Sequence, residues 1–227
     1  MKRTILLAVL IFSACQSQII ESQSQTTKPS ADRINVSNNA IIARDFLIST
    51  DGIGKAKLGM TLGELKLLSG PNTKFEAIPS ITIDSNAIAV SQDGLVQYYI
   101  LYPHNSTFTD NDPITVLITD NYNYQTTRGV KVGTTIEEAE NIYGDAILAY
   151  NPEGEPGEYI TFGEGNPPNI RFKASYFKLI SDGLGYSGLY SQYPGVSSTT
   201  NKYRSDAKIA AIEVSCNPQE CSQLNQF

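Results

Sequence analysis

Residues 57–70 of this 227-residue chain return, with substitutions, as residues 131–144. The offset of 74 is constant, and the lysine, the first and last glycines, the threonine and the glutamate are identical in the two copies. Three further pairs keep their apolar character: Leu58/Val132, Leu62/Ile136 and Leu68/Ile142. A repeat of this length indicates a duplicated supersecondary unit.

Each copy carries the residues that begin and end a short helix. A capping box is predicted for Thr61 with Glu64 and for Thr135 with Glu138, because each threonine is followed three residues later by a glutamate. Apolar side chains then form one helical stripe in each copy: Leu62, Leu65 and Leu68, and Ile136, Ala139, Ile142 and Tyr143. Left-handed glycines, Gly70 and Gly144, are predicted to close the helices. Helices of about two turns are unstable alone and need a sheet to lie on.

Strand patterns follow each predicted helix, separated by loops dense in Gly, Pro and Asn. Asp93-Gly94 lies between two apolar runs and predicts a hairpin with a type I′ turn. The predicted strands cover residues 75–78, 81–83, 87–90, 95–102, 114–119, 146–150, 158–162, 169–180 and 207–215. Residues 41–48 fit either a strand or a short helix. We therefore predict an α+β fold with two copies of a short-helix plus antiparallel-sheet unit, helices on one face of the sheet, in units 40–124 and 125–227.

The N-terminus has the pattern of an export signal over residues 1–14, with two basic residues, an apolar run and small residues before Cys15. Phe12-Ser13-Ala14-Cys15 resembles the lipobox of bacterial lipoproteins, which implies a lipidated Cys15 as the first mature residue; an ordinary secretory signal is the alternative. Residues 15–39 are rich in Gln, Ser, Thr and Asn and are predicted to form a disordered tether. The expected location is the bacterial cell envelope, with the folded part periplasmic or extracellular.

Charge and cysteine content narrow the function classes. Removal of Lys2 and Arg3 with the signal changes the formal charge from -6 to -8, and no Lys/Arg cluster remains, which disfavours binding to nucleic acid. Cys216 and Cys221 form an even pair in an exported chain and predict a disulfide that holds the C-terminus against the last strand. A redox role is the alternative, but the spacing is not Cys-x-x-Cys.

The repeated pattern also carries a family resemblance. Gly59-Met60-Thr61 with Glu64 and the terminal Gly70-Pro71 resembles the small envelope lipoproteins of the SmpA/OmlA (BamE) type. Tandem copies at this separation are similar to the β-lactamase-inhibitor-protein fold. The match covers about fifteen residues in each copy, and the second copy departs from it at Thr134 and Asp145. The resemblance implies a role in protein binding or assembly in the envelope.

Several sequence patterns resemble ligand-binding or catalytic motifs of other proteins, but here they are better explained as surface loops and turns. Gly183 to Gly188 matches a dinucleotide fingerprint in spacing, but no helix start follows it. The single histidine, His104, excludes a site with several histidines and lies in a predicted turn, and Asp110-Asn111-Asp112 lacks the rest of a calcium loop. The acidic residues between 153 and 164 fit a solvated loop better than a glycosidase pair: Glu153, Glu155, Glu158 and Glu164. We expect no cofactor and no metal.

Tyrosine is abundant in the chain, with thirteen residues and no tryptophan. Four of them lie in a long segment rich in Gly, Ser, Thr and Asn between two predicted strands: Tyr186, Tyr190, Tyr193 and Tyr203. This composition is typical of binding loops, and a long loop inside a compact domain is more often functional than idle. The interpretation that we favour over a binding loop is that these tyrosines fold back and cover the sheet.

The sequence thus predicts a membrane-tethered envelope lipoprotein that is not an enzyme and acts as a protein-binding or assembly module. Its expected partners are an envelope protein and, through the lipid on Cys15, the membrane. Two alternatives are an inhibitor of a secreted or envelope enzyme that uses the sheet and the tyrosine loop, and a glycan-binding or glycan-active protein that uses Glu155 and Glu158.

Overall fold

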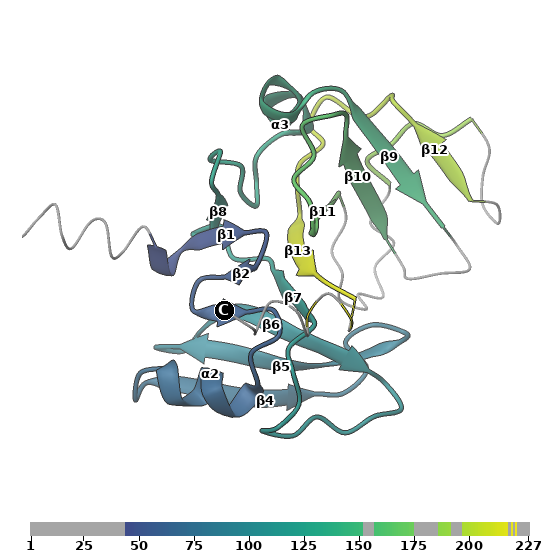
Figure 1. Cartoon of the computed structure of the whole chain (residues 1–227). Coiled ribbons are helices and arrows are strands. Elements are labelled where there is room, and N and C mark those ends of the chain that lie inside the picture. Colours follow the sequence, from purple (N-terminus) through teal and green to yellow (C-terminus); the bar gives the residue numbers. More distant parts are fainter. Residues whose placement is uncertain are drawn as a thin grey trace, which may run out of the picture.

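The computed structural model describes residues 44–151, 157–174, 186–191 and 197–217, with Gln219 and Cys221. Within this part of the chain, two sheets and two short helices form the fold (Figure 1). The smaller sheet has four strands in the order β3-β2-β1-β8, with the bounds β1 Leu47–Ser49, β2 Gly52–Ile53, β3 Ala56–Lys57 and β8 Gln125–Thr126. Strands β1 and β8 are parallel, whereas the other pairs in this sheet are antiparallel.

The larger sheet has nine strands, all paired antiparallel, in the order β12-β9-β10-β11-β13-β7-β6-β5-β4. The first part of the chain supplies β4 Thr73–Ile78, β5 Ser85–Gln92, β6 Leu95–Pro103 and β7 Val116–Thr119. The later part supplies β9 Ala146–Tyr150, β10 Glu158–Phe162, β11 Ile170–Lys173, β12 Ser198–Thr200 and β13 Ala211–Ser215. Pairing of β13 with β7 joins the two parts into one continuous sheet.

The fold is mostly β, so the predicted α+β class with two helix-plus-sheet units is wrong. The two helices contain only seven and eight residues, α2 Leu62–Leu68 and α3 Ile136–Tyr143. Both sheets also combine strands from the two halves of the chain, through β1 with β8 and β7 with β13. The physical reason is that the repeated residues encode helix ends only, while the β-branched and aromatic residues outside them form long strands.

The hairpin between β5 and β6 confirms the Asp93-Gly94 prediction. Both residues have positive φ, 50° for Asp93 and 82° for Gly94, as a type I′ turn requires. Strands β9 and β10 have the predicted bounds. Residues 81–83 were predicted to be a strand, and this is wrong: they form a bend whose residues Ile81 and Thr82 are buried.

Two other strands are shorter at their start than predicted, because the preceding residues pair with the repeated segments instead. Ile114 N–H donates to the Met60 carbonyl, so β7 begins only at Val116. Ile209 N–H donates to the Thr134 carbonyl in the same way, and β13 begins at Ala211. The open choice for residues 41–48 is settled in part, since Leu47 and Ile48 belong to β1 and residues 41–43 lie outside the described residues.

The caps confirm the predicted helix starts. Thr61 and Thr135 each accept a hydrogen bond from the N–H of the glutamate three residues on, and each glutamate accepts one from the threonine N–H. Gly144 has a φ of 94° and ends α3 as predicted. The same prediction for Gly70 is wrong: Ser69 caps α2 in an extended conformation, and its hydroxyl donates to the Leu65 carbonyl.

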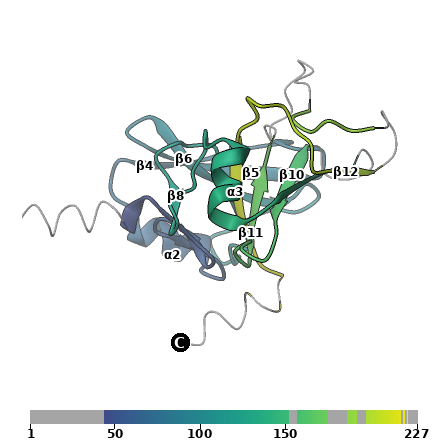
Figure 2. The ribbon, with the colours of Figure 1, turned by 90° about the horizontal axis from the view of Figure 1, so that it is seen from above.

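The main core lies between the larger sheet and a layer that contains the small sheet and both helices. Figure 1 shows α2 and α3 at opposite ends of the molecule with the small sheet between them, and Figure 2 shows α3 from above. Leu62 and Leu65 of α2 and Ile136 and Ala139 of α3 are buried in this core. A smaller apolar cluster covers the other face of the larger sheet: Ile81, Ala87, Ala89, Tyr99, Leu101, Ile118 and Ala211.

Cys216 and Cys221 form the predicted disulfide just after β13, with their Cα atoms 5.7 Å apart. Both sulfur atoms lie about 4 Å from backbone carbonyls at the start of β7, those of Thr115 and Ile114. The disulfide therefore holds the chain after β13 against the neighbouring strand.

Candidate functional site

The predicted tyrosine loop is pinned to the sheet where the structure describes it. Tyr186 and Tyr190 pack with Tyr150 of β9, with ring centroids 4.3 Å and 6.5 Å from that of Tyr150. The Tyr190 hydroxyl donates to Glu158 Oε1 at 2.9 Å, and the Tyr203 hydroxyl donates to Glu140 Oε2 at 2.6 Å. Tyr186 and Tyr190 thus lie against the sheet, and Tyr203 is held to helix α3. Tyr193, the fourth, and Cys15, the predicted lipidation site, lie outside the described residues.

The Glu158 carboxylate stabilises the fold by accepting hydrogen bonds from the segment around Ser187. Its side chain is fully buried, and besides Tyr190 it accepts hydrogen bonds from the N–H groups of Ser187 at 2.5 Å and Gly188 at 2.8 Å. Sequence reasoning had placed this residue in an acidic loop. Instead its carboxylate satisfies backbone donors that would otherwise be buried without a partner.

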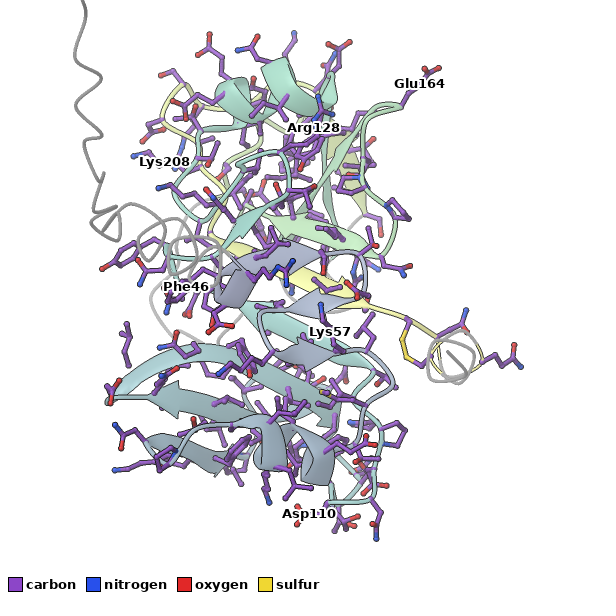
Figure 3. All side chains as sticks on the ribbon, turned by 60° about the vertical axis from the view of Figure 1, so that its left-hand side comes forward. Phe46, Lys57, Asp110, Arg128, Glu164 and Lys208 are labelled. Carbon is purple, nitrogen blue, oxygen red and sulfur yellow. A yellow bond between two sulfur atoms is a disulfide. The ribbon has the colours of Figure 1, made fainter. Side chains whose placement is uncertain are left out.

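Of the other predicted acidic residues, only Glu164 is among the described residues, and it does not join Glu158. Glu164 lies in an exposed turn and points away from the sheet (Figure 3). Glu153 and Glu155 lie outside the described residues. Within the described part of the chain, no group of three or more His, Cys, Asp or Glu side chains is placed to hold a metal ion.

The remaining predicted motifs lie apart from one another: His104 and Asp110 to Asp112 are in surface turns, whereas Gly188 is buried in a β-bridge. His104 is exposed, with Nδ1 3.4 Å from the Ser80 hydroxyl. Asp110 pairs with Lys66 of α2 at 2.6 Å, and Asp112 caps its own turn by accepting from Thr109. Gly188 makes a single bridge to Tyr203 and begins no helix.

None of the helices that the structure describes is long and apolar enough to cross a bilayer.

Two adjacent exposed apolar side chains, Leu67 and Leu68, mark a different place at the end of α2. Leu67 is 87% exposed and Leu68 is 59% exposed, although both stand at the end of a helix that packs on the core. They border an open hollow of about 570 Å³, which is lined by Asp51, Lys57, Leu58, Met60, Glu64, Leu67 and Leu68. The floor and walls of this hollow, here called the α2 hollow, are mainly apolar.

Among the described residues, the charges at the rim of the α2 hollow leave one carboxylate, that of Glu64, without a lysine or arginine within 4 Å. Lys57 pairs with Asp51 at 3.3 Å, and Figure 3 shows Lys57 on the face of the small sheet toward the viewer. Glu64 accepts from the N–H and the hydroxyl of Thr61, at 2.7 Å and 3.0 Å. These hydrogen bonds lower the pKa of Glu64 below its ordinary value, so it is ionised at neutral pH.

Sequence reasoning missed this hollow because it counted Leu68 as part of the buried stripe. Leu62 and Leu65 are buried as predicted, but the helix ends at Leu68, and this side chain faces solvent. A comparison of the two copies of the repeat could have indicated the hollow. Met60 and Leu67 correspond to Thr134 and Asn141 in the second copy, so two apolar residues of the hollow have polar counterparts.

No family profile matches the chain, and no curated protein matches it. A solved structure that is similar is that of the uncharacterized protein YfeY from Escherichia coli, at 13% identity and a TM-score of 0.44. The match covers 74% of this chain and 99% of that one. A likeness this weak carries no inference about fold or function.

Proposed function

We propose that this protein is a non-catalytic, membrane-tethered envelope lipoprotein that binds another envelope protein through the α2 hollow. The observation that carries the proposal is the exposure of Leu67 and Leu68 over an apolar hollow of about 570 Å³. A contiguous apolar surface rimmed by polar groups is typical of interaction sites on soluble domains. The lipobox at Cys15 and the tether after it supply the expected membrane attachment.

The occupant that fits the hollow is an apolar side chain of the partner protein with a basic residue beside it. Apolar anchors that fill pockets dominate the affinity of many protein interfaces. Glu64 is the rim charge that has no lysine or arginine within 4 Å in the described structure, and a basic group on the partner complements it. The acidic balance of the chain, -6 before any processing, favours a basic partner surface in the same way.

The second copy of the repeat offers a matched control for the experiment. A photo-crosslinking residue is placed at position 67 in one variant and at the corresponding position 141 in another, and intact cells are irradiated. We expect one defined crosslinked protein from position 67 that is not obtained from position 141. The crosslink is expected to decrease on Leu68→Asn, and also on Cys15→Ala, because this substitution removes the membrane attachment.

Crosslinks of equal yield from positions 67 and 141, or none from position 67, would overturn the proposal. A turnover activity of the isolated domain that requires residues of the α2 hollow would also overturn it. Thermal unfolding of the Leu67 and Asn141 variants checks that both remain folded, which is expected because both positions are exposed.

A further inference from the structure

Three aromatic side chains from separate parts of the chain line part of a small hollow where the two sheets meet. Phe46 precedes β1, Tyr98 lies in β6, and Tyr124 precedes β8. The Tyr124 ring stands edge-on to both others, at 67° to Phe46 with centroids 5.2 Å apart and at 86° to Tyr98 with centroids 6.2 Å apart. The hollow has a volume of about 160 Å³. Figure 3 shows Phe46 at the outer end of the small sheet.

The walls of this hollow are held in place before any ligand binds. Tyr98 and Tyr124 are 5% and 4% exposed, and the Tyr124 hydroxyl donates to Gln97 Oε1 at 3.3 Å. Gln97 is itself fixed, because its Nε2 donates to the Leu95 carbonyl at 2.9 Å. Gly54, with a φ of 57°, lets the Tyr124 ring approach so closely that an added Cβ would lie 3.2 Å from a ring carbon.

Two charged side chains line the hollow, Asp45 and Lys55. Their closest atoms are 3.9 Å apart, and both side chains are nearly half exposed, so this ion pair is long and hydrated. The pKa of Tyr124 is raised, first by burial and then by the negative charge of Asp45, which places this carboxylate close to the ring. The other lining groups are neutral: Ser69, Gly70, Thr73, Val90, Gln92 and Gln97.

We propose that Phe46, Tyr98 and Tyr124, together with Asp45, form a binding site for a small organic cation of the quaternary ammonium type. Aromatic rings attract a cation through the negative potential of their faces, and several rings set at steep angles are the usual receptor for methylated ammonium groups. Asp45 supplies a full negative charge at the rim, where the ammonium displaces the hydrated Lys55. A trimethylammonium head is about the size of the hollow, whereas a drug-sized ligand needs about 300 Å³ or more.

The test compares choline with its neutral isostere, 3,3-dimethylbutan-1-ol, on the folded protein. Both have the same shape, so only the charge differs. Saturation-transfer NMR of the methyl protons and titration calorimetry give the two affinities. We expect choline to bind about tenfold more tightly than the alcohol, as a cation held by aromatic faces and a carboxylate should. Equal affinity for the two, or no binding of choline, would overturn the proposal.

Variants at the two partly exposed positions of the site assign it while both buried tyrosines stay in the chain. Phe46→Leu and Asp45→Asn are each expected to weaken choline binding about tenfold. Lys55→Gln is expected to strengthen it, because a competing cation is removed. Phe75→Leu is the matched control, since Phe75 is a half-buried ring outside the hollow, 5.8 Å from the Lys66 ammonium. Unchanged choline binding in both the Phe46 and Asp45 variants, or an equal loss in the Phe75 variant, would place the ligand elsewhere.

Discussion

The two copies of the repeated segment begin their helices in the same way but end them in different surroundings. At Thr61 and at Thr135 the capping box is complete, and Gly59 and Gly133 both have positive φ, 84° and 91°. Each copy also binds the segment just before a later strand of the larger sheet, β7 or β13, with equivalent backbone hydrogen bonds. Gly59 N–H donates to the Ile114 carbonyl and Gly133 N–H donates to the Ile209 carbonyl.

The last turns of the two helices differ sharply. Helix α3 ends in Tyr143, which is buried against Phe162 and Phe172, with centroids 5.6 Å away in each case. Its hydroxyl lies 2.8 Å from the Thr126 hydroxyl. Helix α2 ends in exposed Leu67 and Leu68 beside the hollow. The repeated positions therefore determine where a helix starts, and the positions that vary determine whether its end is packed or left open.

The packed end of α3 and the open end of α2 predict the largest contrast in stability. Tyr143→Ala should lower the free energy of unfolding by about 3–5 kcal/mol, because it removes a buried ring and leaves a cavity. Leu67→Ala should change it by about 0.5 kcal/mol or less, because this side chain is already in water. Urea unfolding followed by circular dichroism measures both. Similar losses for the two variants would show that Leu67 is packed in solution.

The helix starts, by contrast, are expected to respond equally. Thr61→Ala and Thr135→Ala each remove the hydroxyl that accepts from the N–H of the glutamate, and each should cost about 1 kcal/mol. Urea unfolding of the two single variants and the double variant is the measurement, with Thr→Ser as the control that retains the hydroxyl. A loss in only one copy would show that the matching caps do not stabilise the fold to the same extent.

The smallest expected effect is on the pH dependence. The pKa of Glu64 and that of Glu138 are lowered, chiefly by the hydrogen bond from the threonine N–H. A carboxylate whose pKa falls on folding stabilises the fold above its unfolded pKa, here the ordinary value of 4.5, and this stabilisation is lost as the pH falls through the folded pKa. In the double variant Glu64→Gln/Glu138→Gln, the free energy of unfolding should therefore fall less steeply as the pH is lowered from 6. An unchanged slope would contradict this prediction.

Local chemistry made several elements predictable. The Asp-Gly pair between β5 and β6 needs positive φ at both positions, and few other turn types accommodate that sequence. The capping boxes were equally clear, since threonine and glutamate three residues apart satisfy each other's backbone donors. The disulfide followed from an even pair of cysteines five residues apart in the chain. The strand order did not follow, because pairing such as that of β13 with β7 joins residues far apart in sequence.

The candidate sites, too, were predictable only where residues close in sequence define them. The excess of tyrosine pointed to the loop around Tyr186 and Tyr190, but nothing local revealed that buried Glu158 would hold that loop against the sheet. The aromatic hollow was not predicted at all, because Phe46, Tyr98 and Tyr124 come from three distant segments.

By itself, the sequence determined the starts of both helices, the end of α3, the tight hairpin turn and the cysteine pair, because each depends on side chains and backbone groups within about six residues. Only the tertiary structure decided that the fold is mostly β, that one sheet runs through both halves of the chain, and that α2 keeps its last two leucines in water while α3 buries its tyrosine. Those outcomes depend on which distant surfaces meet, and burial is decided by the partner surface as much as by the residue itself.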